Sequence, residues 1–160
     1  MAQLGAALSR AGLNDVNTYI QSGNVIATTN LSQKKLERLV HDVIHADFGG
    51  DIAVLARTPN QFSGILEQNP FADADVTKLY FTLLAAPPDN SLLDSFLAND
   101  FTPDRIRYAN NVIYTLYATK HSESRFHNNY FERKLKVSAT TRNFNTMTRL
   151  YTMVAAQADH

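Results

Sequence analysis

The sequence predicts an α+β fold made of two subdomains. Segments rich in β-branched and aromatic residues alternate with segments whose apolar residues recur at helical spacing. Several strand-like segments come in adjacent pairs joined by turn residues, which is typical of antiparallel hairpins. No stretch rich in glycine or serine separates the halves, so we expect two tightly joined subdomains, residues 1–58 and 59–160.

The composition is that of a folded globular protein. Apolar residues make up 44% of the 160 residues and charged residues 19%, which excludes a wholly disordered chain. The absence of cysteine excludes disulfide scaffolds, thiolate zinc sites, iron–sulfur clusters and cysteine nucleophiles. No apolar run approaches the roughly 20 residues of a membrane span, and no signal peptide is evident, so we expect a cytoplasmic protein.

The first subdomain is predicted to contain a helix, two strands, a second helix and a third strand. Gly12 and Gly49 stand where glycines end helices, and Ser32 stands where a serine caps one. Ser22-Gly23 lies between two β-rich segments and predicts a hairpin turn. The expected elements cover residues 2–12, 16–21, 24–28, 33–48 and 52–56.

This order is one strand short of a ferredoxin-like β-α-β-β-α-β unit. The strand that would precede the first helix normally lies inside the sheet, so without it neighbouring backbone groups would be unpaired. We favour a truncated chain or a wrong start codon, and we expect a version extended upstream to melt at a higher temperature. A rearranged sheet and a strand donated from elsewhere are the alternatives.

The second subdomain is predicted to combine helices with one single strand and one hairpin. Asn110-Asn111 marks the hairpin turn, because asparagine tolerates positive φ. The expected helices cover residues 59–68, 90–98, 127–135 and 146–157, and the expected strands cover 79–84, 106–108 and 112–117.

Three strings of residues, Thr18–Val25, Asn69–Phe71 and Ala139–Thr146, occur together in the order and spacing of one bacterial family. The chain resembles the family called domain of unknown function 1697 over residues 1 to about 155. The resemblance implies a cytoplasmic protein of two α/β subdomains, the first ferredoxin-like, and no established activity or catalytic residue. Members of that family usually begin with a strand and a glycine-rich turn that this chain lacks.

Charge is distributed unevenly along the chain, although the formal net charge is zero. Residues 1–100 carry six basic and eleven acidic side chains, whereas residues 101–160 carry nine basic and four acidic ones. A basic pole of this kind attracts anionic partners. The alternative is that folding mixes both halves on one surface.

The segment Thr140–Thr146 is the strongest candidate binding site. Asn143 or Asn145 is placed to cap the last helix, whose free backbone N–H groups favour an anion. With Arg142 as a guanidinium fork and Lys134 and Lys136 as nearby positive charges, the segment predicts a phosphate site. The alternative is a capped loop that satisfies only its own backbone. The candidate residues are Thr140, Thr141, Arg142, Asn143, Asn145, Thr146, Lys134 and Lys136.

A second candidate is the turn formed by Gln21, Ser22, Gly23 and Asn24. Polar side chains beside a glycine suit a close approach to a ligand, but hairpin turns need the same residues for steric reasons. We favour the structural interpretation of this turn.

The histidines carry weaker hypotheses. His41 and His45 are one helical turn apart, but no third metal ligand is evident, so we expect solvated side chains and no metal site. Ser122 and Glu123, flanked by His121 and His127, lack the surrounding motif of a hydrolase. We expect no catalytic motif and no cofactor.

The functional hypothesis is therefore a binding protein for an anionic, phosphate-bearing ligand, either a nucleotide or a nucleic acid. The basic C-terminal half, in which arginines alternate with aromatic residues, would hold it. A structural or interaction protein, in the form of a homodimer, is one alternative. An enzyme acting on a phosphorylated metabolite is the other.

Overall fold

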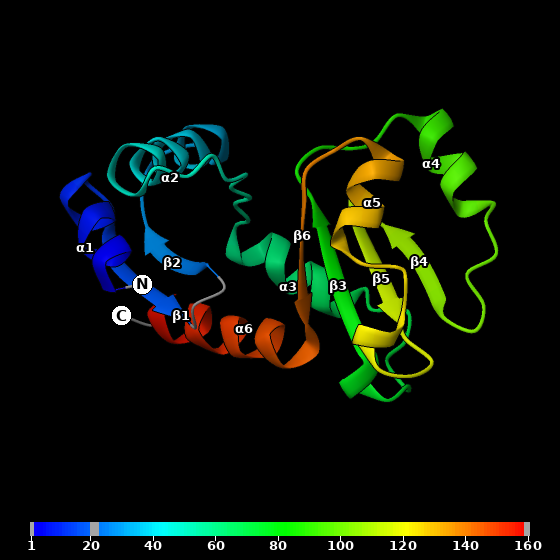
Figure 1. The fold of residues 1–160 in the computed structure, drawn as a ribbon. Helices are drawn as coiled ribbons and strands as arrows, with labels where there is room; N and C mark the ends of the chain where they lie inside the picture. The colour runs from blue at the N-terminus through cyan, green and yellow to red at the C-terminus, as the bar shows by residue number, and fades with distance from the viewer. Residues whose placement is uncertain (1, 20–22, 159–160) are drawn as a thin grey trace. The chain divides into compact units, whose positions relative to one another are not determined.

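The computed structural model describes residues 2–19 and 23–158. It shows helices combined with antiparallel sheets, which confirms the predicted α+β fold (Figure 1). The chain divides into two compact units: the first includes the chain up to Asn60 and from Arg149 onward, and the second is Gln61–Thr148. One continuous helix, α6 (Phe144–Ala158), begins in the second unit and ends in the first.

The first unit contains α1 (Ala2–Arg10), β1 (Asn14–Tyr19), β2 (Asn24–Thr28) and α2 (Gln33–Phe48). Gly12 lies just after helix α1, and its φ of 109° is the left-handed conformation expected of a glycine that follows a helix. The Leu13 N–H then donates to the Leu8 carbonyl at 3.2 Å, which closes the helix end. The predicted hairpin is present, because β1 and β2 pair antiparallel.

Helix α2 has the caps that the sequence predicts. Ser32 Oγ accepts a hydrogen bond from the Lys35 N–H at 3.3 Å, and Gly49 follows the helix with a φ of 78°. The core of the first unit consists of Leu8, Leu13 and Val40, surrounded by partly buried apolar side chains of both helices and both strands. This small core explains why α1 and α2 remain packed on the hairpin.

The strand predicted at residues 52–56 does not form, so the sheet of the first unit has two strands. In a β-α-β-β-α-β unit the last strand pairs with the first strand, and no described segment supplies that partner. A strand without a ladder leaves its backbone groups unsatisfied by other protein groups. Ile52 is accordingly 57% exposed, although the sequence suggested a buried strand.

The second unit is built on a four-stranded antiparallel sheet of order β4-β5-β3-β6. Strand β3 (Leu79–Leu84) lies inside the sheet, and five of its six residues are buried. The hairpin of β4 (Arg105–Ala109) and β5 (Val112–Leu116) turns at Asn110 and Asn111, whose φ values are 48° and 68°. Both asparagines therefore have the left-handed conformation that the turn requires.

Strand β6 (Ala139–Asn143) was not predicted, because its polar sequence resembles a loop. It pairs antiparallel with β3, and Thr82 is opposite Thr141. An edge strand can carry polar residues on both faces, and threonine is favoured in strands because it is branched at Cβ. The predicted site segment Thr140–Thr146 is therefore half strand and half helix.

Helices cover both faces of this sheet. On one face α4 (Asn90–Leu97) and α5 (Asn128–Leu135) contribute Phe96, Phe131 and Leu135 to a core that includes Ile113 and Tyr117. On the other face Tyr114 donates its hydroxyl to the Ile65 carbonyl of α3 (Pro59–Glu67) at 2.7 Å. Two 3₁₀ turns, Val76–Lys78 and His121–Glu123, complete the described elements.

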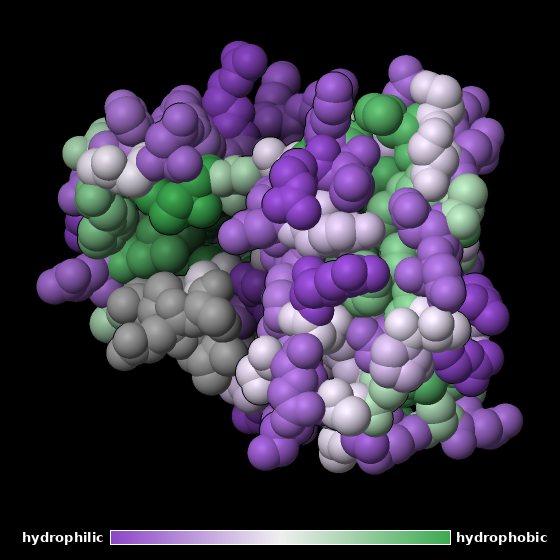
Figure 2. Space-filling view, turned by 45° about the vertical axis from the view of Figure 1, so that its right-hand side comes forward, coloured by the Kyte–Doolittle hydropathy of each residue, from purple (hydrophilic) through white to green (hydrophobic). Residues whose placement is uncertain are grey.

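The surface of the second unit is mainly hydrophilic in the view of Figure 2. This is expected when apolar side chains fill the layers above and below the sheet. In the part of the chain that the structure describes, no helix is long and apolar enough to cross a membrane.

Candidate functional site

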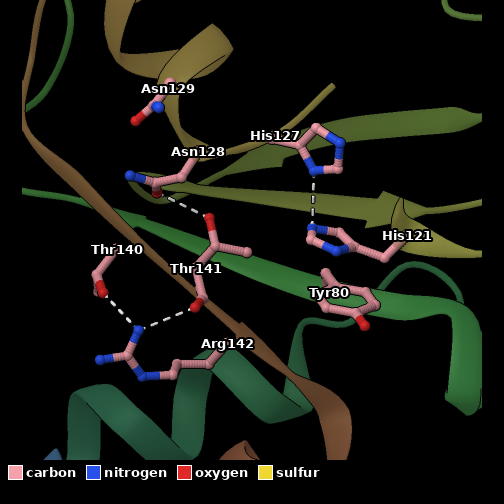
Figure 3. Close-up of a pocket in the computed structure, with 8 residues that line it drawn as sticks. All are labelled: Tyr80, His121, His127, Asn128, Asn129, Thr140, Thr141 and Arg142. Atoms are coloured by element: carbon pink, nitrogen blue, oxygen red, sulfur yellow. Dashed lines mark hydrogen bonds between the residues drawn. The ribbon is translucent and has the colours of Figure 1, made fainter. Parts of the chain in front are cut away.

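A pocket of about 380 Å³ opens in the second unit beside strand β6. Figure 3 shows that three segments distant in sequence line it: β3, the loop before α5 together with the first residues of α5, and β6. None of its lining residues is acidic, and one carries a permanent positive charge. The lining residues are Tyr80, His121, His127, Asn128, Asn129, Thr140, Thr141 and Arg142.

Arg142 is the charged residue of the pocket. Alternation along β6 places Arg142 and Thr140 on the same side of the strand, and Arg142 Nη1 donates to Thr140 Oγ1 at 2.7 Å. The same nitrogen donates to the Thr141 carbonyl at 2.9 Å. The side chain is half-buried, and this burial lowers the pKa of the guanidinium from its usual value. Arg142 is therefore an oriented, partly desolvated cation.

Thr141 points to the opposite side of β6 and ties the pocket to its neighbours. Its hydroxyl lies 2.9 Å from Thr82 Oγ1 and donates to Asn128 Oδ1 at 2.8 Å. Asn128 Nδ2 in turn donates to the Ala139 carbonyl at 3.0 Å. Glu132 Oε2 accepts from the Ala139 N–H at 2.9 Å, so the first turns of α5 are fixed to β6 through side chains.

Two histidines form the wall opposite β6 (Figure 3). His121 Nε2 and His127 Nδ1 are 3.0 Å apart and share a hydrogen bond. The His121 ring stacks on Tyr80, with centroids 4.4 Å apart and an interplanar angle of 12°, and it meets the edge of Tyr117. Burial, followed by the nearby His127, lowers the pKa of His121 from its usual value.

The structure brings together three of the residues predicted from the sequence: Thr140, Thr141 and Arg142. Asn143 has the expected capping role, since its Oδ1 accepts from the Thr146 N–H at 2.8 Å at the start of α6. Thr146 is 7% exposed, and Asn145 is exposed. No lining residue comes from α6, so the helix terminus is not part of this pocket.

The two lysines do not join Arg142, although the sequence suggested a common cluster. Lys134 is exposed on α5, and its Nζ lies 5.8 Å from the centre of the Tyr130 ring. Lys136 ends α5 in the left-handed conformation, with a φ of 57°, and it is exposed. Neither lysine lines the pocket.

The predicted turn at residues 21–24 belongs to the first unit. Gln21 and Ser22 lie outside the described residues. Gly23 has a φ of 88°, and Asn24 is buried, with its Nδ2 donating to the Tyr19 carbonyl at 3.1 Å. The contacts of Asn24 thus hold the two strands of the hairpin together.

Five lining residues were not predicted as part of this site: Tyr80, His121, His127, Asn128 and Asn129. The only available signal was the recurrence of two histidines around a short polar loop. Ser122 and Glu123, around which the sequence shows no hydrolase motif, are exposed. Among the residues that the structure describes, no group of three or more histidine or acidic side chains is placed to hold a metal ion.

Comparison with known proteins places the chain in a family. A family model described as "Protein of unknown function (DUF1697)" matches residues 1–114. No curated protein matches the chain. The solved structure of the conserved bacterial protein SP0830 from Streptococcus pneumoniae is similar, with a TM-score of 0.73 and 19% identity, over 97% of this chain and 88% of that one. This likeness shows the fold, and the matched residues confirm the family that the sequence resembles: the chain belongs to the DUF1697 family.

Proposed function

We propose that the second unit binds a small, phosphate-bearing anion in the pocket beside β6, with Arg142 as its principal contact. The observation that carries this proposal is the half-buried guanidinium of Arg142, oriented by Thr140 and Thr141 at the wall of a pocket without acidic lining residues. An oriented cation in a partly desolvated position attracts an anion more strongly than an exposed one. A cytoplasmic location, expected from the sequence, belongs to this proposal.

The chemistry of the other lining groups supports phosphate over a simple carboxylate. The Thr140 hydroxyl, which accepts from Arg142 and keeps its own O–H, and the asparagine amides of the pocket supply neutral hydrogen-bond donors near the guanidinium. Phosphate has more acceptor oxygens than a carboxylate and makes use of more donors. A volume of about 380 Å³ also lies in the usual range of small-molecule sites.

A small molecule is favoured over nucleic acid. The arginines interleaved with aromatic residues lie over rings of the protein itself: Arg125 over Phe126 at 5.1 Å, and Arg105 over Phe71 at 5.0 Å. Such stacking occupies the ring faces on which bases of a single strand would stack. We therefore assign the binding to the pocket and not to an extended surface.

The proposal is tested by calorimetric titration with inorganic phosphate and with AMP. Arg142→Gln should weaken binding about 10- to 100-fold, because a charge-assisted hydrogen-bond partner is lost. Arg133→Gln is the matched control: Arg133 is exposed on α5 and lies over the Tyr130 ring, outside the pocket lining. It should bind as the unchanged protein does.

Thermal melting of both variants checks that they are folded. Failure of the unchanged protein to bind either probe at millimolar concentration contradicts the proposal. Equal weakening by Arg142→Gln and Arg133→Gln also contradicts it, since the effect would then follow total charge.

A further inference from the structure

The hydrogen bond between His121 and His127 determines what the pair presents to its surroundings. Two of the four ring nitrogens face each other at 3.0 Å, so in the neutral pair one donates a proton and the other accepts it. Each neutral imidazole has a single N–H. Whichever ring donates, the pair retains one nitrogen with a lone pair and one nitrogen with a proton, at His121 Nδ1 and His127 Nε2.

These two remaining nitrogens are available for chemistry. Among the residues that the structure describes, neither His121 Nδ1 nor His127 Nε2 has a hydrogen-bond partner. Partly buried polar atoms are normally satisfied by protein, water or a ligand. Both histidines line the same pocket as Arg142.

The groups around His121 favour its neutral form. Tyr80 of β3 and Tyr117 after β5 pack on His121, and Arg142 lines the same pocket from β6. On the loop itself, Lys120 and Glu123 are exposed. No acidic residue lines the pocket, and the pKa of His121 lies below its usual value, so its lone pair persists at neutral pH.

One further carboxylate reaches the loop that carries His121. Asp104 accepts from the Ala118 N–H and from Ser124 Oγ, both at 2.8 Å. These bonds hold the loop at both ends of its 3₁₀ turn. The stack on Tyr80 fixes the ring itself, so the pair is preorganised before any ligand enters.

We infer that His121 and His127 form the acid–base centre of a hydrolytic site that acts on a phosphate monoester held by Arg142. This inference rests on the proposed function of the pocket and adds a reaction to it. A hydrogen-bonded imidazole pair beside an anion-binding group supplies the two functions that ester hydrolysis needs, a proton acceptor and a proton donor.

The step balances with water as the second reactant. The free imidazole lone pair takes a proton from water while the water oxygen bonds to phosphorus, and the bond from phosphorus to the ester oxygen breaks. The pair, which now carries one extra proton, returns a proton to the leaving alkoxide. The products are an alcohol and inorganic phosphate, and the pair is again neutral with its inner hydrogen bond restored.

The test measures turnover of 4-nitrophenyl phosphate, AMP and a sugar phosphate, alongside calorimetric binding of inorganic phosphate. His121→Gln and His127→Gln should each lower kcat about 100- to 10,000-fold, the usual contribution of a general base or acid. Phosphate binding should change only a few-fold. His45→Gln, in the first unit and exposed, is the matched control and should leave kcat unchanged.

The pH profile separates this role from a structural one. In the unchanged protein kcat should fall at acidic pH as the imidazole lone pair is protonated, and this limb should disappear from the residual activity of the variants. The melting temperature of each variant shows whether it is folded. If His127→Gln does not fold, the same kcat measurement is made on His127→Asn.

The outcomes distinguish the inference from the proposed function. Binding of phosphate that depends on Arg142, without turnover of any of the three esters, overturns the inference and leaves the proposed function standing. Turnover that EDTA abolishes also overturns it, because the chemistry would then belong to a metal ion. Absence of phosphate binding overturns both.

Discussion

The hydroxyl groups of Thr82 and Thr141 lie 2.9 Å apart, although 59 residues separate them in the chain. Thr82 is fully buried in β3, and Thr141 is its partner in β6. A hydroxyl inside a sheet face stabilises the fold only when it has a hydrogen-bond partner. The pair therefore holds the edge strand that carries Arg142 in register with the core of the sheet.

Replacement of Thr141 by valine tests this relationship. Thr141→Val removes the bonds to the fully buried Thr82 hydroxyl and to the amide oxygen of the partly buried Asn128, and it leaves both groups without this partner. We expect a loss of about 1–3 kcal/mol in the free energy of unfolding, measured by urea denaturation. Thr119→Val, at an exposed position, is the control and should change the free energy little. An equal effect of both substitutions would show that the threonine pair does not hold β6.

Substitution of the asparagines at the start of α6 tests whether this part of the segment Thr140–Thr146 stabilises the fold or binds the ligand. Asn143→Ala removes the acceptor of the Thr146 N–H and should cost about 1 kcal/mol of stability, seen as a lower melting temperature. Asn145→Ala, at an exposed position in the first turn, should have a smaller effect. Because neither asparagine lines the pocket, phosphate affinity should be unchanged in both variants. A large loss of affinity in either would contradict this.

Two substitutions of Lys136 separate the effect of backbone strain on stability from the effect of the lysine charge on phosphate binding. Its φ of 57° places a side chain in the left-handed region, which glycine adopts without strain. Lys136→Gly should raise the stability by about 0.5–1 kcal/mol, measured by chemical denaturation. Lys136→Ala removes the same charge but keeps the strain, so it serves as the control. If both variants weaken phosphate binding equally, the charge of Lys136 contributes after all.

Tyr114 gives a pH dependence of stability. The residue is fully buried, and burial raises the pKa of its hydroxyl from 10.0 to about 12. The folded state thus favours the protonated phenol, so its contribution is complete below pH 10 and is lost as the pH rises toward about 12. Tyr114→Phe removes the bond to the Ile65 carbonyl and should cost about 1–2 kcal/mol near neutral pH.

The measurement for Tyr114 is the free energy of unfolding between pH 8 and pH 11, compared with the Tyr114→Phe variant. The unchanged protein should lose stability faster than the variant over this range. Thr119→Val, at an exposed position and without a change of titratable group, is the control and should leave the pH dependence as it is. Parallel curves for the unchanged protein and Tyr114→Phe would contradict the prediction.

Local signals in the sequence determined most of the elements. Ser32 caps α2, Gly12 and Gly49 end helices, and Asn110 with Asn111 turns the second hairpin. Each of these signals acts through the conformation or hydrogen bonding of a few neighbouring residues, so it can be recognised without the fold. The three strings of residues that resemble the family could likewise be recognised without the fold.

Tertiary structure alone decided the strands at the margins of the two sheets. Ile52–Ala56 is apolar enough for a strand, but no described segment pairs with it. Ala139–Asn143 is polar enough for a loop, but β3 offers it a ladder. A strand exists only when a second strand supplies its hydrogen bonds, and that partner can be anywhere in the chain.

The same reason governs the candidate site. The sequence alone indicated Arg142 with its flanking threonines, because a guanidinium in a polar segment is a local feature. It grouped Lys134 and Lys136 with them by proximity in the chain, whereas the fold directs those lysines elsewhere and brings Tyr80, His121 and His127 instead. A pocket is formed by side chains that converge in space, and that convergence depends on how β3, the loop before α5 and β6 pack together.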